Sequence, residues 1–362
     1  MAGGPIQSIT TLTKHLSQDF NFKIITTDRD FKSNTPYSDV EINKWTKFEG
    51  REVFYMSPEN MNPEFILNLI QSCEYDVIYL NSLFSKLFTI YPLKWKKQKR
   101  IQKPIVLAPR GMLRDAALAV KPLKKQLFLL YAKLSGLFSN IHWQSTSAQE
   151  TLEITKRIGN VKLLEVSNLP DVSDASLSIT KTVGELRLCF IARIVDIKNL
   201  NFAIEVLKEI KQYTIIFDVY GPQEDVDYWQ TCEANAKNLQ ANIHFKYCGS
   251  VPSQLIAKTI SNYHALFLPT QTENFGHVIV QSLQCGRPVI ISNNTPWQQL
   301  VIHKAGYDID LHDKLKFIEA INTLVNLNQS QFNDLYISSK EYINSKLKIN
   351  ELKQLYIKLF NI

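Results

Sequence analysis

Two cations and one short polar loop are the residues of this sequence best suited to chemistry. Arg193 and Lys198 follow an apolar run that predicts a strand, and both side chains can converge on one anion. Arginine offers a planar fork to phosphate oxygens, and lysine offers a compact charge. The polar loop 270–274 follows a second apolar run and leads into Gly276 at the start of a predicted helix. Because a helix start presents N–H groups to anions, these residues together predict a metal-independent diphosphate site.

The sequence around that loop predicts a strand, a loop, a helix and a second strand. Residues 265–268 and 289–291 are short apolar runs typical of buried strands. The helix between them is expected to end at Gly286, which suits a left-handed cap, with Pro288 just beyond. In open α/β sheets, ligands bind at the carboxyl ends of the strands. The loop therefore lies where such a sheet binds its ligand, and Gly276 allows close approach to the backbone.

The same alternation extends over the whole chain. In the second half we expect further strands at 186–191, 214–220 and 243–248, and helices at 201–211, 225–239, 252–260 and 295–300. In the first half we expect strands at 22–26, 53–56, 77–80, 105–108 and 161–166. Strands that alternate with helices predict α/β domains with parallel sheets wound on both faces.

A turn at 168–171 suggests a boundary within 170–183. We therefore expect an N-terminal domain at 1–175, a C-terminal domain at 176–345 and a last helix within 346–362. The chain begins with a loop at 1–5, and the helix expected around 8–16 has no strand before it. Either the first sheet lacks one strand or the true chain starts upstream of Met1, and the sequence leaves both open.

Composition is that of an ordinary soluble protein, with 45% hydrophobic and 21% charged residues among 362. This length accommodates two α/β cores. No signal peptide and no apolar run of membrane-spanning length is evident. The five cysteines form no C-x-x-C pair, which favours a reduced, cytoplasmic chain: Cys73, Cys189, Cys232, Cys248 and Cys285.

Several classes of site are disfavoured. The seven histidines are scattered, and the acid-x-acid pairs at 28–30, 225–227 and 308–310 are too short a pattern to predict a metal ion. We expect no metal and no tightly bound cofactor. The chain has no G-x-x-x-x-G-K-[ST], no G-x-G-x-x-G and no G-x-S-x-G. A nicotinamide dehydrogenase and an α/β-hydrolase are therefore disfavoured.

Positive charge is concentrated between Lys86 and Lys133, where thirteen Lys and Arg stand against Asp115 alone. Leucines at helical spacing run through the end of this basic segment, at 123, 127, 130, 134 and 137. Aromatic and apolar residues are interleaved with the charges: Phe84, Phe88, Trp95, Phe128, Leu129, Tyr131 and Phe138. A cationic helix of this kind suits an anionic membrane surface. It equally suits a solvated face on a helix that packs domains together, and nucleic acid ranks third because no binding module is present.

These motifs resemble the retaining family-4 glycosyltransferases with the GT-B fold, in which two Rossmann-like domains face each other across a cleft. The most specific mark is Glu273 with position 281 and the following Gly-x-Pro-Val at 286–289. The other matching blocks are 2–5, 108–113, Arg193 with Lys198, 221–222, Gly249, 273–276 and 295–297. The blocks at 109–113 and 295–297 are similar to members that build bacterial surface polysaccharides. The resemblance also implies that the C-terminal helix crosses back to the first domain.

That resemblance implies retaining transfer from a nucleotide-sugar, such as a UDP- or GDP-sugar, to a glycan or polyprenyl-linked acceptor. Arg193 and Lys198 would hold the diphosphate, and Glu273 would hydrogen-bond a sugar hydroxyl. The other donor-binding residues it implies are Gly3, Gly4, Gly221, Gly249, Val251, Asn274, Phe275, Gly276 and Gln281. Arg110 and Asn81 are the acceptor-side candidates. The expected setting is O-antigen, capsule or exopolysaccharide synthesis, in the cytoplasm or at the inner face of the plasma membrane.

Two positions depart from the family pattern. Gln281 replaces the second Glu, and its amide can hydrogen-bond a ribose hydroxyl but cannot act as a base or a charge. Arg110 stands near the position where many relatives have a His beside the reacting sugar. The sequence shows no carboxylate pair of the kind that glycosidases hold ~5–5.5 Å apart. The resemblance implies instead that catalysis rests on stabilisation of the departing diphosphate. A catalytically degenerate partner subunit and a sugar-nucleotide epimerase are the alternatives.

Overall fold

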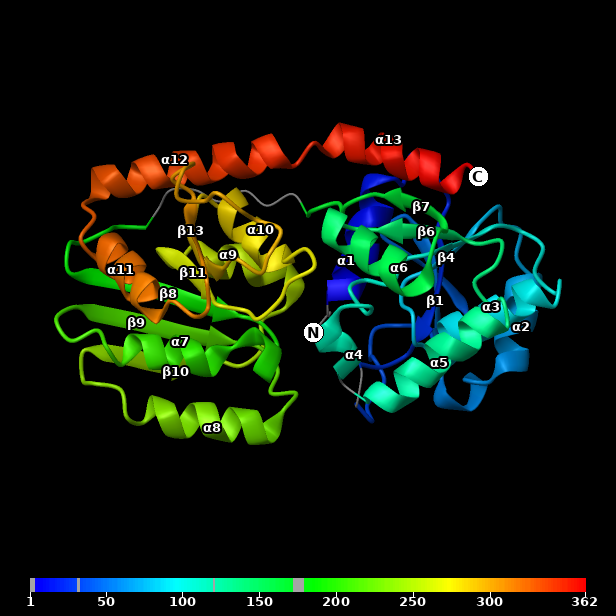
Figure 1. Cartoon of the computed structure of the whole chain (residues 1–362), viewed down its shortest axis with the longest axis horizontal. Coiled ribbons are helices and arrows are strands. Elements are labelled where there is room, and N and C mark those ends of the chain that lie inside the picture. Colours follow the sequence, from blue (N-terminus) through cyan, green and yellow to red (C-terminus); the bar gives the residue numbers. More distant parts are fainter. Residues whose placement is uncertain (1–3, 31–32, 120, 172–178) are drawn as a thin grey trace. The chain divides into compact units, whose positions relative to one another are not determined.

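The computed structural model describes residues 4–30, 33–119, 121–171 and 179–362. The chain divides into two compact units (Figure 1). We call Pro5–Leu169 with Ile349–Ile362 the N-terminal unit, and Pro170–Lys348 the C-terminal unit. Both are built from helices and mainly parallel strands, so the α/β class expected from the sequence is confirmed. The expected boundary region 170–183 falls partly on 172–178, outside the described residues.

The C-terminal unit contains one sheet in the order β10-β9-β8-β11-β12-β13, and every pairing in it is parallel. Its strands are β8 (Glu185–Ile191), β9 (Thr214–Tyr220), β10 (Ile243–Tyr247), β11 (Ala265–Leu268), β12 (Val289–Ser292) and β13 (Gly306–Ile309). The chain builds outward from β8 to β10 and then returns to the other side of β8. The strand order therefore reverses between β8 and β11, which is the place where open α/β sheets bind ligands.

Helices and short 3-10 turns connect these strands. They are η3 (Asp196–Lys198), α7 (Leu200–Leu207), α8 (Val226–Ala236), η4 (Ser253–Leu255), α9 (Ile256–Ile260), α10 (His277–Gln284), α11 (Lys314–Val325) and α12 (Gln329–Lys346). Side-chain caps set several of their starts. Asp225 caps α8 by accepting a hydrogen bond from the Tyr228 N–H, and Asn328 begins α12 with a reciprocal capping box. Strands β11 and β12 are buried throughout, which explains their uninterrupted apolar sequences.

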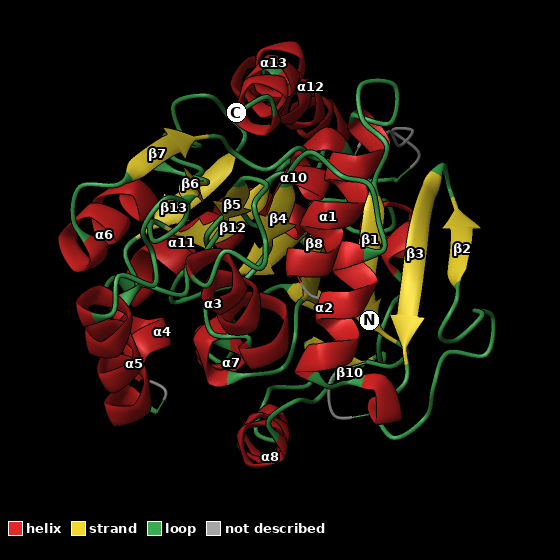
Figure 2. Ribbon diagram, turned by 90° about the vertical axis from the view of Figure 1, so that its right-hand side faces the viewer, coloured by secondary structure: helices red, strands yellow, loops and turns green. Residues whose placement is uncertain are grey.

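The described residues of the N-terminal unit form two sheets. A parallel sheet has the order β4-β5-β6-β7, and a smaller sheet has the order β1-β3-β2 with β2 antiparallel to β3 (Figure 2). The strands are β1 (Lys23–Thr27), β2 (Trp45–Phe48), β3 (Arg51–Met56), β4 (Ile78–Leu80), β5 (Ile105–Leu107), β6 (His142–Ser145) and β7 (Lys162–Glu165). The helix that precedes β1 is α1 (Gly4–His15), and residues 1–3 lie outside the described part of the chain.

The other helices of this unit are η1 (Pro58–Asn60), α2 (Pro63–Gln71), η2 (Lys86–Ile90), α3 (Tyr91–Lys97), α4 (Asp115–Ala119), α5 (Pro122–Leu134), α6 (Ala148–Ile158) and α13 (Ile349–Phe360). The last helix, α13, packs into the core beside α1. Its Tyr356, Leu359 and Phe360 share one apolar cluster with Leu12 and Leu16. The expectation that the C-terminal helix returns to the first domain is therefore confirmed.

The helix expected at 295–300 is wrong. The hydroxyl of Thr295 accepts a hydrogen bond from the Trp297 N–H at 3.2 Å, which closes a tight turn in place of a helix. Two further N–H groups, from Gln299 and Leu300, donate to the Asp308 carboxylate at 2.9 Å each. Three strands were also not expected from the sequence, namely β2, β6 and β13.

Candidate active site

The carboxyl edge of the C-terminal sheet gathers most of the donor-binding residues expected from the sequence. Because neighbouring strands are parallel, the segments that follow β8, β9, β10 and β11 leave the sheet at the same edge. These segments carry Arg193 with Lys198, then Gly221, then Gly249 with Val251, and finally 273–276. Arg193 and Lys198 therefore share the reversal point of the strand order with the Glu273 loop.

The segments after β8 and β11 are joined by hydrogen bonds. The carbonyl of Ile197 accepts from the Gln271 N–H at 2.9 Å and from the Thr270 hydroxyl at 3.0 Å. The side-chain amide of Asn199 donates to the carbonyl of Pro269 at 3.0 Å. Asn199 has φ 61°, a left-handed conformation that asparagine tolerates better than most residues. These bonds hold Lys198 against the loop that carries Glu273.

Lys198 and Glu273 form an ion pair between Nζ and Oε2. Their side chains are only 14% and 18% exposed, so the pair is largely withdrawn from water. The backbone of Glu273 is fixed as well, because its N–H donates to the carbonyl of Asn294 at 3.1 Å. The site therefore presents a lysine and a carboxylate in set positions, one suited to phosphate oxygens and the other to a hydroxyl donor.

Arg193 is paired differently. Its Nη1 donates to Oε2 of Glu224 at 2.9 Å, and the two side chains are 46% and 33% exposed. An exposed ion pair of this kind contributes only about 0–1 kcal/mol to stability. A phosphate group can therefore replace Glu224 at small cost. The sequence reasoning missed Glu224; its signal was a carboxylate two residues beyond the 221–222 turn, at the end of the strand next to β8.

The start of α10 requires glycine at position 276. Gly276 has φ 77°, and a Cβ there would lie 2.9 Å from Ile279 Cδ1 and 3.0 Å from Glu273 Cγ. Within the described residues, the N–H groups of Phe275 and Gly276 donate to no protein acceptor. The N-terminus of a helix carries partial positive charge. These two N–H groups therefore add donors for an anion beside Lys198.

Trp297 stabilises the loop that carries Phe275 and Gly276. Its indole Nε1 donates to the carbonyl of Phe275 at 2.5 Å, and the two ring centroids are 5.5 Å apart. The side chain is buried. The turn at 295–297 thus fixes the backbone that carries the Phe275 and Gly276 N–H groups. The sequence analysis expected a helix at 295–300 and therefore did not predict the contact of Trp297 with Phe275.

Gly221 joins the other two segments of the edge. It has φ 146°, and a Cβ would lie 1.6 Å from the carbonyl oxygen of Ala192, so no other residue fits. Its N–H donates to the carbonyl of Gly249 at 2.9 Å. Gly249 itself has φ 76° and open space where a Cβ would be, while Val251 is buried. The segments after β8, β9 and β10 are consequently held together through backbone atoms.

Gln281 lies within α10 and is 4% exposed. Because α10 starts at His277, Glu273 belongs to the loop before the helix, and the two residues do not lie on one helix. The neutral amide of Gln281 adds no charge to the edge. Among the residues that the structure describes, no group of three or more His, Cys, Asp or Glu side chains is placed to hold a metal ion.

In the N-terminal unit, Arg110 and Asn81 follow β5 and β4 and contact each other. The Arg110 guanidinium donates from Nε to Asn81 Oδ1 at 2.6 Å and from Nη2 to Tyr79 Oη at 2.6 Å, and Nη1 donates to Asn168 Oδ1. Burial lowers the pKa of Arg110, but nearby tyrosine hydroxyls and Glu150 outweigh it and leave the pKa above its ordinary value. Arg110 is therefore a permanent cation that is held by Asn81, Tyr79 and Asn168.

Asn81 also donates to the carbonyl of Pro5 at 3.0 Å. Of the two glycines expected near the donor phosphates, Gly4 is the first residue of α1, and open space surrounds the position of a Cβ there. Gly3 lies outside the described residues.

Comparison with known proteins identifies one family. Residues 176–339 match the family described as Glycosyl transferases group 1. This range covers the whole sheet edge described above. No curated protein sequence matches the chain.

Several solved structures share the fold at low sequence identity. HepE of Anabaena, crystallised with UDP-glucose, is 14% identical with a TM-score of 0.72, and the match covers 100% of this chain and 97% of HepE. Sucrose-phosphate synthase of Thermosynechococcus elongatus is 15% identical with a TM-score of 0.71, over 99% of this chain and 94% of the synthase. TarM of S. aureus, crystallised with fondaparinux, α-GlcNAc-glycerol and UDP, is 16% identical with a TM-score of 0.61. The match covers 82% of this chain and 58% of TarM, so the chain spans less than two thirds of that protein.

Proposed function

Since residues 176–339 are a Glycosyl transferases group 1 domain and the chain has the GT-B fold, we propose that the protein transfers a sugar from a nucleotide-sugar to an acceptor hydroxyl. The observation that carries this proposal is the C-terminal sheet edge. There, two cations, the N–H groups of Phe275 and Gly276 just before α10, and the fixed carboxylate of Glu273 meet at the reversal of strand order. A nucleoside diphosphate linked to a sugar matches this set, because it offers two phosphates and several hydroxyl groups.

The proposed chemistry follows from the charges at this edge. Arg193 and Lys198 stabilise the negative charge that develops on the departing diphosphate. Glu273 accepts a hydrogen bond from a sugar hydroxyl and positions the ring, with Lys198 holding its carboxylate. We propose that the anomeric configuration is retained, with the departing diphosphate accepting the proton of the acceptor hydroxyl. No metal ion takes part in this scheme.

On the acceptor side we propose that Arg110 and Asn81 face a glycan or a polyprenyl-linked acceptor. The Arg110 guanidinium keeps its positive charge, which suits a phosphate group of such an acceptor. The blocks at 109–113 and 295–297 support a place in bacterial O-antigen, capsule or exopolysaccharide synthesis. Such a reaction takes place at the inner face of the plasma membrane, where the basic segment 86–133 would meet anionic lipid.

The test is a panel of UDP- and GDP-sugars incubated with the protein, with and without bacterial membrane extract as acceptor. The proposal predicts release of nucleoside diphosphate from one donor, only when the extract is present. An altered free sugar or sugar-nucleotide formed without extract would identify an epimerase. A folded chain that binds none of the donors and shows no turnover would identify a degenerate subunit. Either result would refute transferase activity.

A further inference from the structure

Helix α5 has two apolar faces, and only one of them packs against the protein. Phe128 and Leu129 are partly buried and Ala132 is fully buried on the inner face. The ring of Phe128 lies 5.7 Å from that of Phe84 and 6.3 Å from that of Phe138. This inner face accounts for the attachment of α5 to the N-terminal unit. It does not explain why the opposite face of the helix is apolar as well.

The outer face carries four leucines and a tyrosine in one stripe. At about 100° of rotation per residue, the five side chains fall within an arc of about 100°. Their exposed fractions are 76% for Leu123, 66% for Leu127, 54% for Leu130, 49% for Tyr131 and 79% for Leu134. Single exposed leucines are normal, but a contiguous apolar stripe marks an interaction surface. We call these five residues the leucine stripe.

The structure separates the leucine stripe from the other apolar residues of the basic segment. Leu137 continues the same spacing but follows the end of α5 and is buried. Trp95 and Phe138 are buried as well, and Phe88 packs against a core cluster. Among the described apolar residues singled out in 86–133, those on the outer face of α5 are the exposed ones, so the predicted surface narrows to this helix.

Lysines border the leucine stripe on both sides. Lys124 and Lys133 stand at its two edges, and Lys121 lies at the N-terminal end of the helix. Within the described part of the chain, none of these three forms an ion pair with a carboxylate. Lys94 of α3 adds a fourth cation, with Nζ 5.9 Å from the ring of Tyr131. No acidic residue occurs in Pro122–Leu134.

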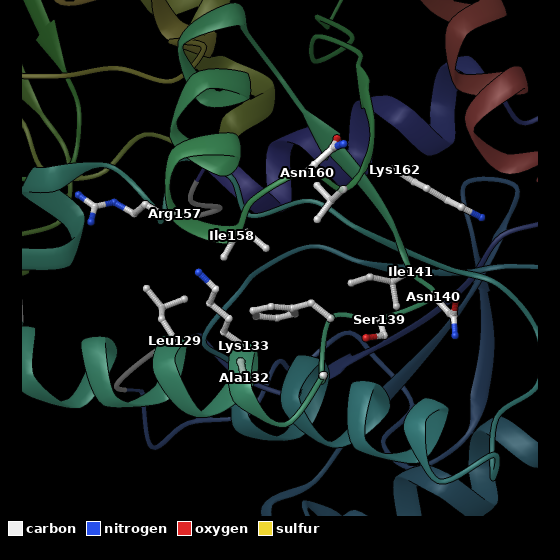
Figure 3. Close-up of a pocket in the computed structure, with 13 residues that line it drawn as sticks. Leu129, Ala132, Lys133, Ser139, Asn140, Ile141, Arg157, Ile158, Asn160 and Lys162 are labelled. Atoms are coloured by element: carbon white, nitrogen blue, oxygen red, sulfur yellow. The ribbon is translucent and has the colours of Figure 1, made fainter.

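A hollow of about 400 Å³ adjoins the Lys133 side of α5 (Figure 3). Lys133 reaches into it from the helix, beside Leu129. Arg157 and Lys162 line its rim, and its other lining residues are apolar or neutral. Arg157 is partly committed, because it pairs with Asp115. The hollow thus contains the ammonium group of Lys133 among apolar and neutral residues, next to the leucine stripe, while the Lys162 side chain extends away from it.

We propose that the outer face of α5 docks into the interfacial region of an anionic phospholipid bilayer. The leucine stripe enters the boundary between headgroups and acyl chains, and the bordering lysines contact lipid phosphates. The hollow beside Lys133 accommodates one lipid headgroup. No helix in the described residues is long and apolar enough to cross a membrane. The helix accordingly lies in the plane of the surface.

The charge pattern favours lipid over a second copy of this chain. A twofold contact through α5 would place the same patch on both partners. The lysines of one copy would then face those of the other with no acidic residue between them, which is unfavourable. An anionic bilayer instead provides negative charge opposite every lysine. This proposal does not depend on donor binding, since α5 and the sheet edge belong to different units.

The experiment is flotation of the full chain with phosphatidylcholine vesicles that contain or lack phosphatidylglycerol. The wild type is expected to float with the anionic vesicles and to dissociate as salt rises. Replacement of Leu123, Leu127, Leu130 and Leu134 by Ser is expected to weaken binding by at least about tenfold, because it removes the inserted apolar area. The matched control replaces four leucines and isoleucines of similar exposure by Ser, at Leu152, Ile302, Leu315 and Ile337. That control is expected to bind like the wild type.

Three results would overturn the proposal: no flotation of the wild type, equal flotation of the α5 variant, or equal loss in the control variant. Light scattering on the same samples distinguishes lipid binding from self-association of the chain. A wild type that is dimeric without lipid, becomes monomeric in the α5 variant and does not float would assign the stripe to self-association. Unchanged thermal unfolding of the α5 variant shows that it is folded. Unchanged nucleotide-sugar binding by that variant separates this outcome from failure of the proposed function.

Discussion

Two arginines follow strands at the carboxyl edges of the two main sheets, and they are held in opposite ways. Arg193 in the C-terminal unit is half-exposed and pairs with one exposed carboxylate, Glu224. Arg110 in the N-terminal unit donates to three neutral acceptors from Asn81, Tyr79 and Asn168. The first contact is easily exchanged for a ligand, whereas the second is part of the local structure.

This difference teaches that a cation at a strand end is not by itself a ligand site. Arg193 can exchange Glu224 for a phosphate because an exposed ion pair has little net energy. Arg110 cannot leave its partners without exposing unpaired polar groups in a buried network, which is costly. The network continues from Tyr79 to Gln144, which in turn contacts Tyr356 of α13. Arg110 thus links the strand ends to the last helix.

The largest effect is expected from removing both cations of the C-terminal edge. Arg193→Ala combined with Lys198→Ala should lower the transfer rate by about 10³-fold or more, since charge-stabilising donors each contribute about 10²–10³ in rate. The measurement is release of nucleoside diphosphate from the donor that the panel identifies. The matched control is Lys208→Ala, which removes an ion pair to Glu205 at the other end of α7. An unchanged transfer rate in the double variant would show that the two cations of the C-terminal edge do not take part in the reaction.

Removal of Arg110 is expected to lower the stability of the protein more than removal of Arg193. Arg110→Ala leaves the buried Asn168 and the partly buried Asn81 and Tyr79 without their donor, and it should lower the free energy of unfolding by about 3 kcal/mol. Arg193→Ala should change it by less than about 1 kcal/mol. Denaturant unfolding of both variants provides the comparison. Equal destabilisation would mean that the two arginines are held alike, contrary to the contrast drawn above.

A smaller effect is expected at Gly276. Alanine there forces a left-handed conformation and places a Cβ against Ile279 and Glu273, so donor affinity should fall by about tenfold, equivalent to about 1.4 kcal/mol. Gly184→Ala is the matched control, with φ 89° and nothing within 4 Å of the added Cβ. Both variants should lose stability through backbone strain. Calorimetric titration with the donor should show weaker binding for Gly276→Ala alone. Equal losses of donor affinity in both variants would show that the loop at Gly276 does not form part of the donor site.

The smallest effect is expected at Trp297, which stabilises the loop that carries Phe275 and Gly276. Trp297→Phe keeps an aromatic ring but removes the hydrogen bond to the Phe275 carbonyl. Loss of about 1 kcal/mol of positioning should raise the donor Kd by roughly fivefold with kcat nearly unchanged. Trp45→Phe in β2 serves as the control. A fall in kcat with an unchanged Kd would show that Trp297 acts on the chemical step.

The strand ends of the C-terminal edge could be predicted from the sequence because their signals are local. Apolar runs followed by Arg193, Lys198 and Glu273 are sufficient to place these residues on one edge of a parallel sheet. Their partners could not be predicted in the same way. Glu224 and Asn294 reach the site from other strand ends, and only the packed sheet brings them near.

The errors have the same origin. The segment at 295–300 has helix-start signals, but Asp308 of β13 captures the N–H groups of Gln299 and Leu300. Strand β6 was missed because Gln144 and Ser145 interrupt its apolar character. Gln144 is buried nonetheless, since its amide donates to the carbonyl of Val166 at 2.7 Å and to Tyr356. Distant partners thus override the local pattern in both places.

The central claim is that the C-terminal sheet edge binds a nucleotide-sugar through its diphosphate. Calorimetric titration of the wild-type chain with UDP-glucose and a set of other UDP- and GDP-sugars tests it most directly. We predict that one donor binds at a single site with a Kd between about 1 μM and 1 mM, the usual range for enzyme substrates. The free nucleoside diphosphate should compete with it. A folded chain that binds neither a donor nor a nucleoside diphosphate would contradict the account.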